Sequence, residues 1–282
     1  LQGIDELGLP IYFTTYNNSI AAATTNTNKL YNGGGLGLSL SGSTIGNAKV
    51  AIWDGGAVLL SHIELINRVL TKDNAKTLST HSTHVAGTIM ATGINQVAKG
   101  MSFGLPQLLS FEFNNDISEM SASATDLLIS NHSYGTVSGW RFNDDVTPAR
   151  WEFMGAPDEN EDYKFGYYNS AAKEWDKICY NAPYYLPVKS AGNNRNDNGP
   201  AVGLPYFRYN SSGVMASAGN RPTGISSNNG YDIISTYGNA KNILTVGAIN
   251  PLPFGPTSTA SIQISSFSSW GPTDDGRIKP DI

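Results

Sequence analysis

Short apolar runs alternate with longer stretches in which apolar residues recur at helical spacing. Each run contains consecutive aliphatic or aromatic residues and stops at glycine, asparagine, proline or a polar cluster, which predicts strands buried on both faces. The predicted strands are 49–54, 108–113, 184–189, 242–249 and 264–270.

Three stretches between these runs have the spacing of helices. Thr80 precedes a helical pattern to residue 91 and serves as its expected N-cap. Asp116 and Glu119 form a capping-box pattern for a second helix, 116–129, and a third is expected at 167–180. Alternating strands and helices predict an α/β fold with a mainly parallel sheet covered on both faces, and one domain over 1–282.

Two regions show no clean period and should lie at the surface. Residues 1–47 are rich in Asn, Thr, Gly and Ser, and 136–165 carry the acidic run 158–162. We interpret 1–47 as an N-terminal surface segment and 136–165 as a surface insertion, with the acidic run as a solvated face. The Gly/Asn-rich stretch 194–230 is expected to be a loop.

Composition narrows the class of protein. The chain has 282 residues, of which 40% are hydrophobic and 15% charged, and a net charge of −5. An acidic balance without basic runs argues against a nucleic-acid partner, and no apolar run is long enough to span a bilayer. Cys179 is the single cysteine, so there is no intrachain disulfide framework, and we expect it in the core. Few cysteines and few charges are compatible with secretion.

Three polar residues have reason to converge. Asp54 ends a predicted strand, His81 lies on the first turn of a helix and Asn193 follows another strand. The carboxyl ends of parallel strands meet at one edge of a sheet. There a carboxylate can orient an imidazole, the imidazole can act as a general base, and an amide can donate to an oxyanion. The nucleophile is missing from this set.

Five motifs together resemble those of subtilisin-like serine proteases, the subtilases, and occur in that family's order over residues 50–282. They are Asp54-Gly55-Gly56, His81-Ser82-Thr83-His84-Val85-Ala86-Gly87-Thr88, Asn131-His132-Ser133-Tyr134-Gly135, Ser190-Ala191-Gly192-Asn193 and Phe267-Ser268-Ser269-Trp270-Gly271-Pro272. The resemblance implies a three-layer subtilisin-like fold, a peptide or protein substrate, secretion and removal of a propeptide.

The resemblance also implies roles for single residues. Asp54 matches the orienting carboxylate, His81 the general base and Asn193 the oxyanion donor, whereas His84 matches a structural position of the histidine motif. Two segments match the backbone walls of the pocket for the residue before the cleaved bond. These walls are Ser133, Tyr134 and Gly135 on one side and Ser190, Ala191 and Gly192 on the other.

The sequence departs from the family at several positions. Gly55 stands where subtilases usually have Ser or Thr, and Ser82 where they usually have Gly. Glu64 lies near the position of a calcium-binding Asp in many relatives, but the loop 93–98 lacks a convincing set of oxygen ligands. We therefore expect no required cofactor and find no sequence support for a calcium ion there.

The family's nucleophile lies in a Gly-Thr-Ser-Met-Ala-type motif that would follow Ile282, so the sequence matches the larger, N-terminal part of a peptidase domain. In one interpretation, a C-terminal fragment of the same precursor supplies the serine of a secreted endopeptidase. In a second, the chain is a truncated, inactive subtilase fold that acts as a binding module. In a third, His81, His84 and Asp54 form the metal site of a hydrolase.

Overall fold

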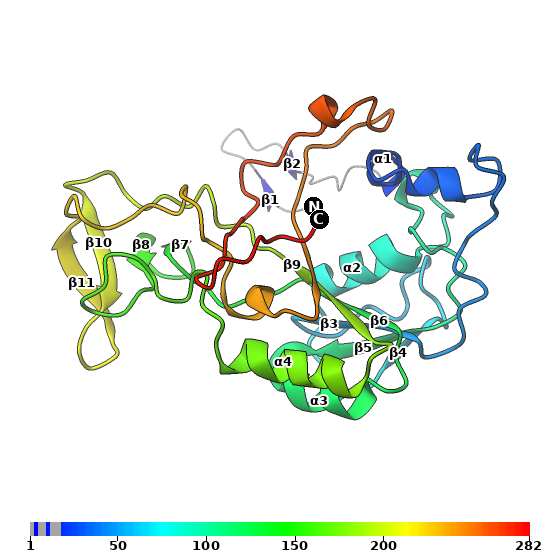
Figure 1. The fold of residues 1–282 in the computed structure, drawn as a ribbon, viewed down its shortest axis with the longest axis horizontal. Helices are drawn as coiled ribbons and strands as arrows, with labels where there is room; N and C mark the ends of the chain where they lie inside the picture. Colours follow the sequence, from blue (N-terminus) through cyan, green and yellow to red (C-terminus); the bar gives the residue numbers. More distant parts are fainter. Residues whose placement is uncertain (1–2, 5–9, 12–17) are drawn as a thin grey trace.

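A six-stranded parallel sheet forms the centre of the computed structural model, which describes residues 3–4, 10–11 and 18–282 (Figure 1). Neighbouring strands pair in parallel throughout, in the order β12-β9-β6-β3-β5-β4. The carboxyl ends of all six strands therefore lie at one edge. The strands are β3 (Val50–Asp54), β4 (Val69–Thr71), β5 (Leu108–Glu112), β6 (Ile129–His132), β9 (Leu186–Ser190) and β12 (Leu244–Val246).

Helices cover both faces of this sheet. Figure 1 shows α3 (Asp116–Ser123) and α4 (Ser170–Asn181) on one face and α2 (Thr80–Met90) on the other. The expected α/β fold with a mainly parallel central sheet is confirmed. Helix α1 (Asn18–Thr24) lies farther out, and β1 (Gly3–Ile4) pairs with β2 (Pro10–Ile11); the rest of the predicted surface segment before residue 18 lies outside the described residues.

Strand β3 shows how the sequence produces three layers. All five of its residues are buried, and alternate side chains point to opposite faces of the sheet. Ala51 and Trp53 enter the core under α3 and α4, whereas Val50 and Ile52 enter the core under α2. Trp53 stacks on the ring of Phe111, with 4.3 Å between centroids. An uninterrupted apolar run is what a strand covered on both faces requires.

Several predicted elements begin or end at other residues in the structure, and one predicted strand is absent from the described residues. Ser79, not Thr80, is the N-cap of α2, because its Oγ accepts from the Ser82 amide at 3.0 Å. Helix α3 ends at Ser123 rather than 129, because the apolar residues that follow enter the turn before β6 and β6 itself. The predicted strand 264–270 is wrong: only Ile264 pairs, in an isolated bridge with Ile249.

Neither 136–165 nor 194–230 is irregular throughout, because the two stretches together build a second sheet. Its order is β11-β10-β8-β7, and β8 pairs in parallel with β10 across about 50 residues of chain. These strands enclose a small core of their own around Trp140, Phe153 and Tyr206. The strands are β7 (Trp140–Asn143), β8 (Arg150–Phe153), β10 (Pro205–Tyr209) and β11 (Met215–Asn220).

The structure also shows where the acidic run and the single cysteine lie. Asp162, the last residue of the acidic run, is buried rather than solvated, and it accepts from the Gly139 amide and pairs with Lys164 Nζ at 2.8 Å. Cys179 is a core residue under α4, as expected. Within the part of the chain that the structure describes, no helix is both long and apolar enough to cross a membrane.

Candidate active site

Asp54 and His81 meet at the carboxyl edge of the sheet. Strand β3 ends on Asp54, the first turn of α2 carries His81, and the imidazole Nδ1 lies 2.7 Å from the Asp54 Oδ1. The aspartate side chain is 2% exposed and the histidine side chain 57%. Because an ionised carboxylate only accepts, Nδ1 donates the proton, and Nε2 is left with the lone pair that a general base needs.

Further donors hold the buried Asp54 carboxylate in place. Its Oδ1 also accepts from the Gly55 amide at 2.8 Å and from the Ser82 hydroxyl at 2.9 Å. These contacts stabilise a charge that would otherwise be costly to bury. Position 55 has no side chain, so the hydroxyl that binds Asp54 comes from position 82.

The two predicted pocket walls follow neighbouring strands at this same edge. Ser133–Gly135 continue from β6 and Ser190–Gly192 from β9, and these strands pair in parallel with His132 opposite Lys189. The Ala191 amide donates to Val246 O at 2.8 Å, which prolongs the pairing with β12 past the end of β9. The Ser133–Gly135 wall therefore follows the strand next to β3, where the Asp54–His81 pair stands, and the Ser190–Gly192 wall follows the next strand beyond it.

Gly192 and Asn193 form the turn after β9. Gly192 has a φ of +117°, and a Cβ there would stand 2.8 Å from Ser269 Oγ, so no other residue fits without strain. Asn193 is exposed, and within residues 18–282 its side-chain amide makes no hydrogen bond. The amide is thus available to donate to a ligand at this edge; its assignment as the oxyanion donor stays a prediction.

Tyr134 is anchored from below by a chain of buried hydrogen bonds. Its hydroxyl donates to Asp116 Oδ2 at 2.6 Å and lies 3.1 Å from His132 Nδ1. His132 Nε2 lies 2.7 Å from Ser130 Oγ in turn. Burial lowers the pKa of His132, and the charge of Lys189 lowers it further, so His132 is neutral. The anchored hydroxyl gives one pocket wall a fixed aromatic side chain.

The structure gives no support to a metal site built from His81, His84 and Asp54. His84 is exposed and lines a separate pocket of about 530 Å³ together with His62 and Glu64. In residues 18–282, no three His, Cys, Asp or Glu side chains lie close enough together to hold a metal ion.

Glu64, which the resemblance places near a calcium ligand of related sequences, binds the loop 92–95 directly. Its Oε2 accepts from Thr92 Oγ1 at 2.6 Å and from the amides of Gly93 and Ile94, and its Oε1 accepts from the Asn95 amide at 2.8 Å. Burial opposes ionisation, but these four hydrogen bonds prevail and lower the pKa of Glu64 from 4.5 to about 2. The loop therefore presents donors to Glu64, whereas calcium requires oxygen ligands.

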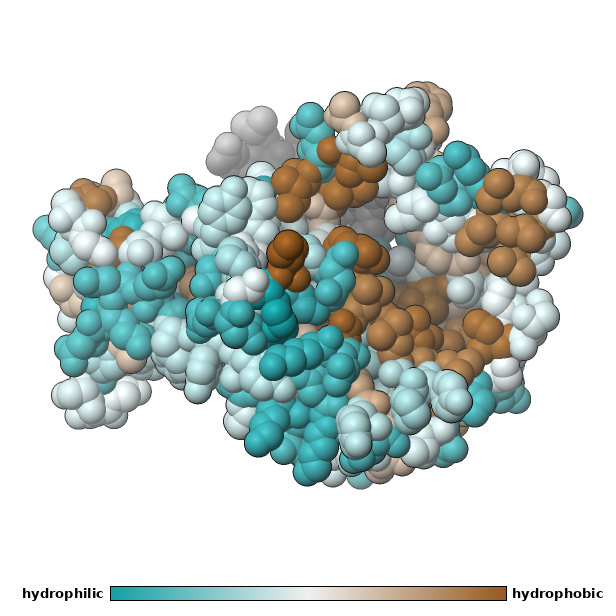
Figure 2. All heavy atoms as spheres, in the orientation of Figure 1, coloured by the Kyte–Doolittle hydropathy of each residue, from teal (hydrophilic) through white to brown (hydrophobic). Residues whose placement is uncertain are grey.

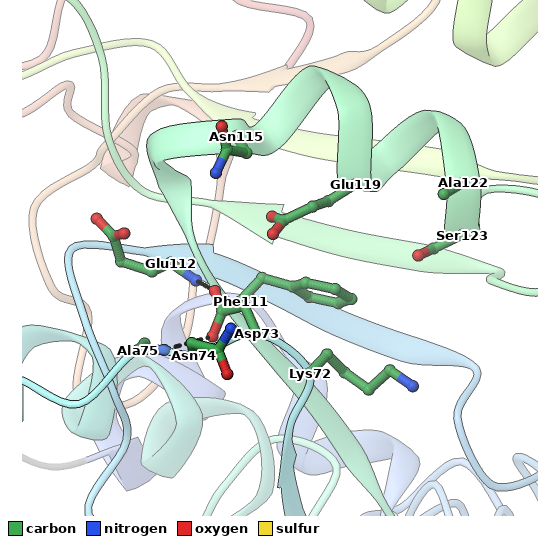
Figure 3. Close-up of a pocket in the computed structure, with 10 residues that line it drawn as sticks. All are labelled: Lys72, Asp73, Asn74, Ala75, Phe111, Glu112, Asn115, Glu119, Ala122 and Ser123. Carbon is green, nitrogen blue, oxygen red and sulfur yellow. Dashed lines mark hydrogen bonds between the residues drawn. The ribbon is translucent and has the colours of Figure 1, made fainter.

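An acidic pocket of about 490 Å³ lies between α3, the end of β5 and the residues that follow β4 (Figure 3). Glu112 at the end of β5 is the register partner of Asp54, and Glu119 projects from α3 toward Asp73 across the pocket. Burial raises the pKa of Glu119, and the charges of Asp73, Asp116 and Glu112 add to this effect. Sequence reasoning missed this pocket because its carboxylates come from three separate elements.

Comparison with known proteins identifies the class to which this geometry belongs. A model of the Subtilase family matches residues 60–282, and the chain belongs to that family. His81 and Asn193 fall inside the matched region, whereas Asp54 precedes it. No curated protein matches the sequence.

A solved protease structure with a TM-score above 0.5 shares the fold, and others match it less closely. The CspB protease of Clostridium perfringens is 12% identical, with a TM-score of 0.53, over 94% of this chain and 78% of that one. The prenylagaramide maturation protease PagA is 14% identical over 82% of this chain, with a TM-score of 0.45. The epidermin leader peptide processing protease EpiP of Staphylococcus aureus is 18% identical over 94%, also with a TM-score of 0.45. This chain spans 61% of the length of PagA and 59% of EpiP.

Proposed function

We propose that this chain supplies the general base, its orienting carboxylate and the oxyanion donor of a secreted serine endopeptidase. The observation that carries the proposal is the 2.7 Å contact between His81 Nδ1 and Asp54 Oδ1, which joins an exposed imidazole to a buried carboxylate. Such a pair leaves the second imidazole nitrogen ready to take a proton from a nucleophile. The low cysteine and charge content supports secretion.

The proposed reaction proceeds through an acyl-enzyme. His81 Nε2 takes the serine proton while the serine oxygen bonds to the peptide carbon, and Asp54 stabilises the imidazolium. The Asn193 amide donates to the carbonyl oxygen as it becomes negative. The imidazolium then protonates the departing amine, which breaks the C–N bond, and water attacks the ester by the reverse sequence to release the acid. Main-chain atoms of Ser133–Gly135 pair with the substrate strand.

We further propose that the serine lies outside residues 1–282, in a C-terminal part of the same precursor. An apolar groove of about 340 Å³ beside α2 supports this proposal, because a segment carrying the serine could bury it. Figure 2 shows apolar side chains gathered on this face, beside and below α2 in the view. The apolar residues lining the groove are Ile45, Val50, Ile89, Met101, Leu105, Ile129 and Val188.

Labelling by a fluorophosphonate tests the proposal. Protein purified with its C-terminal part is treated with the probe, and intact masses are read under denaturing conditions. We expect the label on a serine outside residues 1–282, and we expect His81→Ala and Asp54→Asn each to abolish labelling and peptide cleavage while the protein stays folded by circular dichroism. Folded wild-type protein that takes no label would contradict the proposal and favour a binding module.

A further inference from the structure

A lysine is buried beneath the two pocket walls. Lys189 lies on β9 directly before Ser190 and is 3% exposed. Its register partner is His132, which pairs in turn with Trp53, and Trp53 with Phe111. One row of side chains thus crosses the sheet from Phe111 to Lys189 and on to Thr245 of β12, and it places an ammonium group beside aromatic rings. An alkyl or aromatic side chain would pack there without the cost of burying a charge.

The ammonium lies between the walls rather than away from them. Lys189 Nζ donates to Ser190 O at 2.8 Å and to Ser190 Oγ at 3.0 Å on one side. On the other side it lies 5.8 Å from the centroid of the Tyr134 ring. It also lies only 3.7 Å from the point where a Cβ would stand at Gly135. Because Gly135 is exposed and has no side chain, a substrate side chain laid against it can reach Nζ.

Only neutral groups accept hydrogen bonds from this ammonium. Among residues 18–282, no carboxylate lies within 4.0 Å of Nζ, and one of its three hydrogens has no acceptor. The groups that face it are the neutral His132 and the Tyr134 ring, and the nearby Asp116 is engaged by the Tyr134 hydroxyl. Burial without a counter-charge lowers the pKa of Lys189 to about 7.

We infer that Lys189 determines specificity by receiving the carboxylate of an acidic side chain, glutamate or aspartate, at the substrate residue before the cleaved bond. The inference rests on the proposed function, because it assigns this pocket to that residue. A carboxylate would give the third hydrogen an acceptor and the buried charge a partner, and hydrogen bonds between charged groups are the strong ones. A neutral side chain of equal size would leave the buried charge of Lys189 without a counter-charge and would accept a weaker hydrogen bond.

The test compares peptides that differ only at this residue. The enzyme with its C-terminal part is assayed on matched substrates carrying Glu, Gln, Leu or Lys. At pH 6 we expect kcat/KM for Glu to exceed that for Gln on the order of 10- to 100-fold. In Lys189→Met, which keeps the length without the charge, the Glu-to-Gln ratio should fall to about one. Lys173→Met, at an exposed lysine of α4, is the control and should keep the wild-type ratio.

The pH dependence of the Glu-to-Gln ratio provides a second readout. The Glu-to-Gln ratio of the wild type should fall as the pH rises past about 7 and Lys189 loses its proton, whereas Lys189→Met should show no such fall. A purely structural lysine would change the stability of Lys189→Met but leave the ratio intact. Equal rates for Glu and Gln, or a preference for Leu or Lys, overturn the inference while the enzyme still cleaves. Absence of cleavage of every peptide and of probe labelling overturns the proposed function instead.

Discussion

The hydroxyl of Ser82 donates a hydrogen bond to Asp54 Oδ1 across 2.9 Å, to the same oxygen that binds the imidazole of His81. Ser82 is completely buried, and the other oxygen of Asp54, Oδ2, is buried without a hydrogen-bond partner in the described residues. The carboxylate is therefore fixed through one oxygen, by donors that arrive from the strand end and from the helix.

We predict that Ser82→Ala lowers the free energy of unfolding by about 1–3 kcal/mol, because a buried charged acceptor loses a donor. It should also lower kcat by weakening the orientation of His81. Urea unfolding and steady-state kinetics measure the two effects. Thr80→Ala, at an exposed hydroxyl of the same helix turn, is the control and should change stability by less than about 0.5 kcal/mol. Equal stability of the two variants would show that the Ser82 contact is unimportant.

Asn193→Ala should reduce kcat while leaving KM nearly unchanged. The amide is expected to donate only when the oxyanion forms, so its loss affects the transition state rather than substrate binding. In subtilisin, loss of one such donor costs roughly 10²–10³ in kcat. Asn196→Ala, at an exposed asparagine of the same loop, is the matched control. A rise in KM alone would mean that another group forms the oxyanion hole.

Glu64→Gln should destabilise the protein at neutral pH, because a carboxamide cannot replace a carboxylate that accepts from four donors. The folded-state pKa of about 2 lies below the ordinary 4.5, so this stabilisation is present above pH 4.5 and is lost as the pH falls toward 2. At about 1.4 kcal/mol per pKa unit, the full effect is about 3 kcal/mol. Urea unfolding at pH 7, 4 and 3 should show wild type and variant converging in acid, whereas Glu174→Gln on the surface should match the wild type throughout.

The Glu64→Gln variant also tests whether the Glu64 carboxylate binds calcium. Since the loop 92–95 offers donors to Glu64, we predict that Glu64→Gln and wild type gain the same increment in melting temperature on addition of calcium, whatever that increment is. A gain seen in the wild type and lost in the variant would place the ion at Glu64.

Asp232→Asn should stabilise the protein above pH 6. The Oδ1 atoms of Asp232 and Asp274 both crowd the space where Gly166 would carry a Cβ. Burial, followed by the charge of Asp274, raises the pKa of Asp232 to about 6. A raised carboxyl pKa costs stability as the pH rises from 3.8 to about 6, and the cost then stays constant. Melting temperatures of the variant and wild type should coincide near pH 4 and separate by pH 7.

Asp158→Asn, at an exposed carboxylate without that pairing, is the control for Asp232→Asn and should follow the wild type at both pH values. A gain at pH 4 equal to that at pH 7 would show that the benefit does not come from the ionised pair.

The features that could be predicted from the sequence are those determined by the local pattern of apolar and polar residues. The run 50–54 is buried whole, and a strand end followed by a helix start brings Asp54 and His81 within hydrogen-bonding distance. The second sheet was missed because β8 and β10 pair across a long stretch of chain, and no period within either segment encodes such a partner.

Roles that depend on a distant partner were also hidden. In the sequence, Glu64 resembles a metal ligand. The structure shows that the amides of residues 93–95 point toward its carboxylate instead. Lys189 is a single basic residue in an apolar run, and only the pairing of β9 with β6 shows that it lies beneath Tyr134 and Gly135. A charged residue inside a predicted buried strand is the signal that could have found it.

The contact between Asp54 and His81 spans only 27 residues of sequence, and this affects the order of events during synthesis. Chains emerge from the ribosome N-terminus first and begin to fold in that order. Both residues of the pair are made before Asn193 and before the proposed serine. A chain still in synthesis up to that point therefore has neither the oxyanion donor nor the nucleophile, and it cannot cut its neighbours by this mechanism.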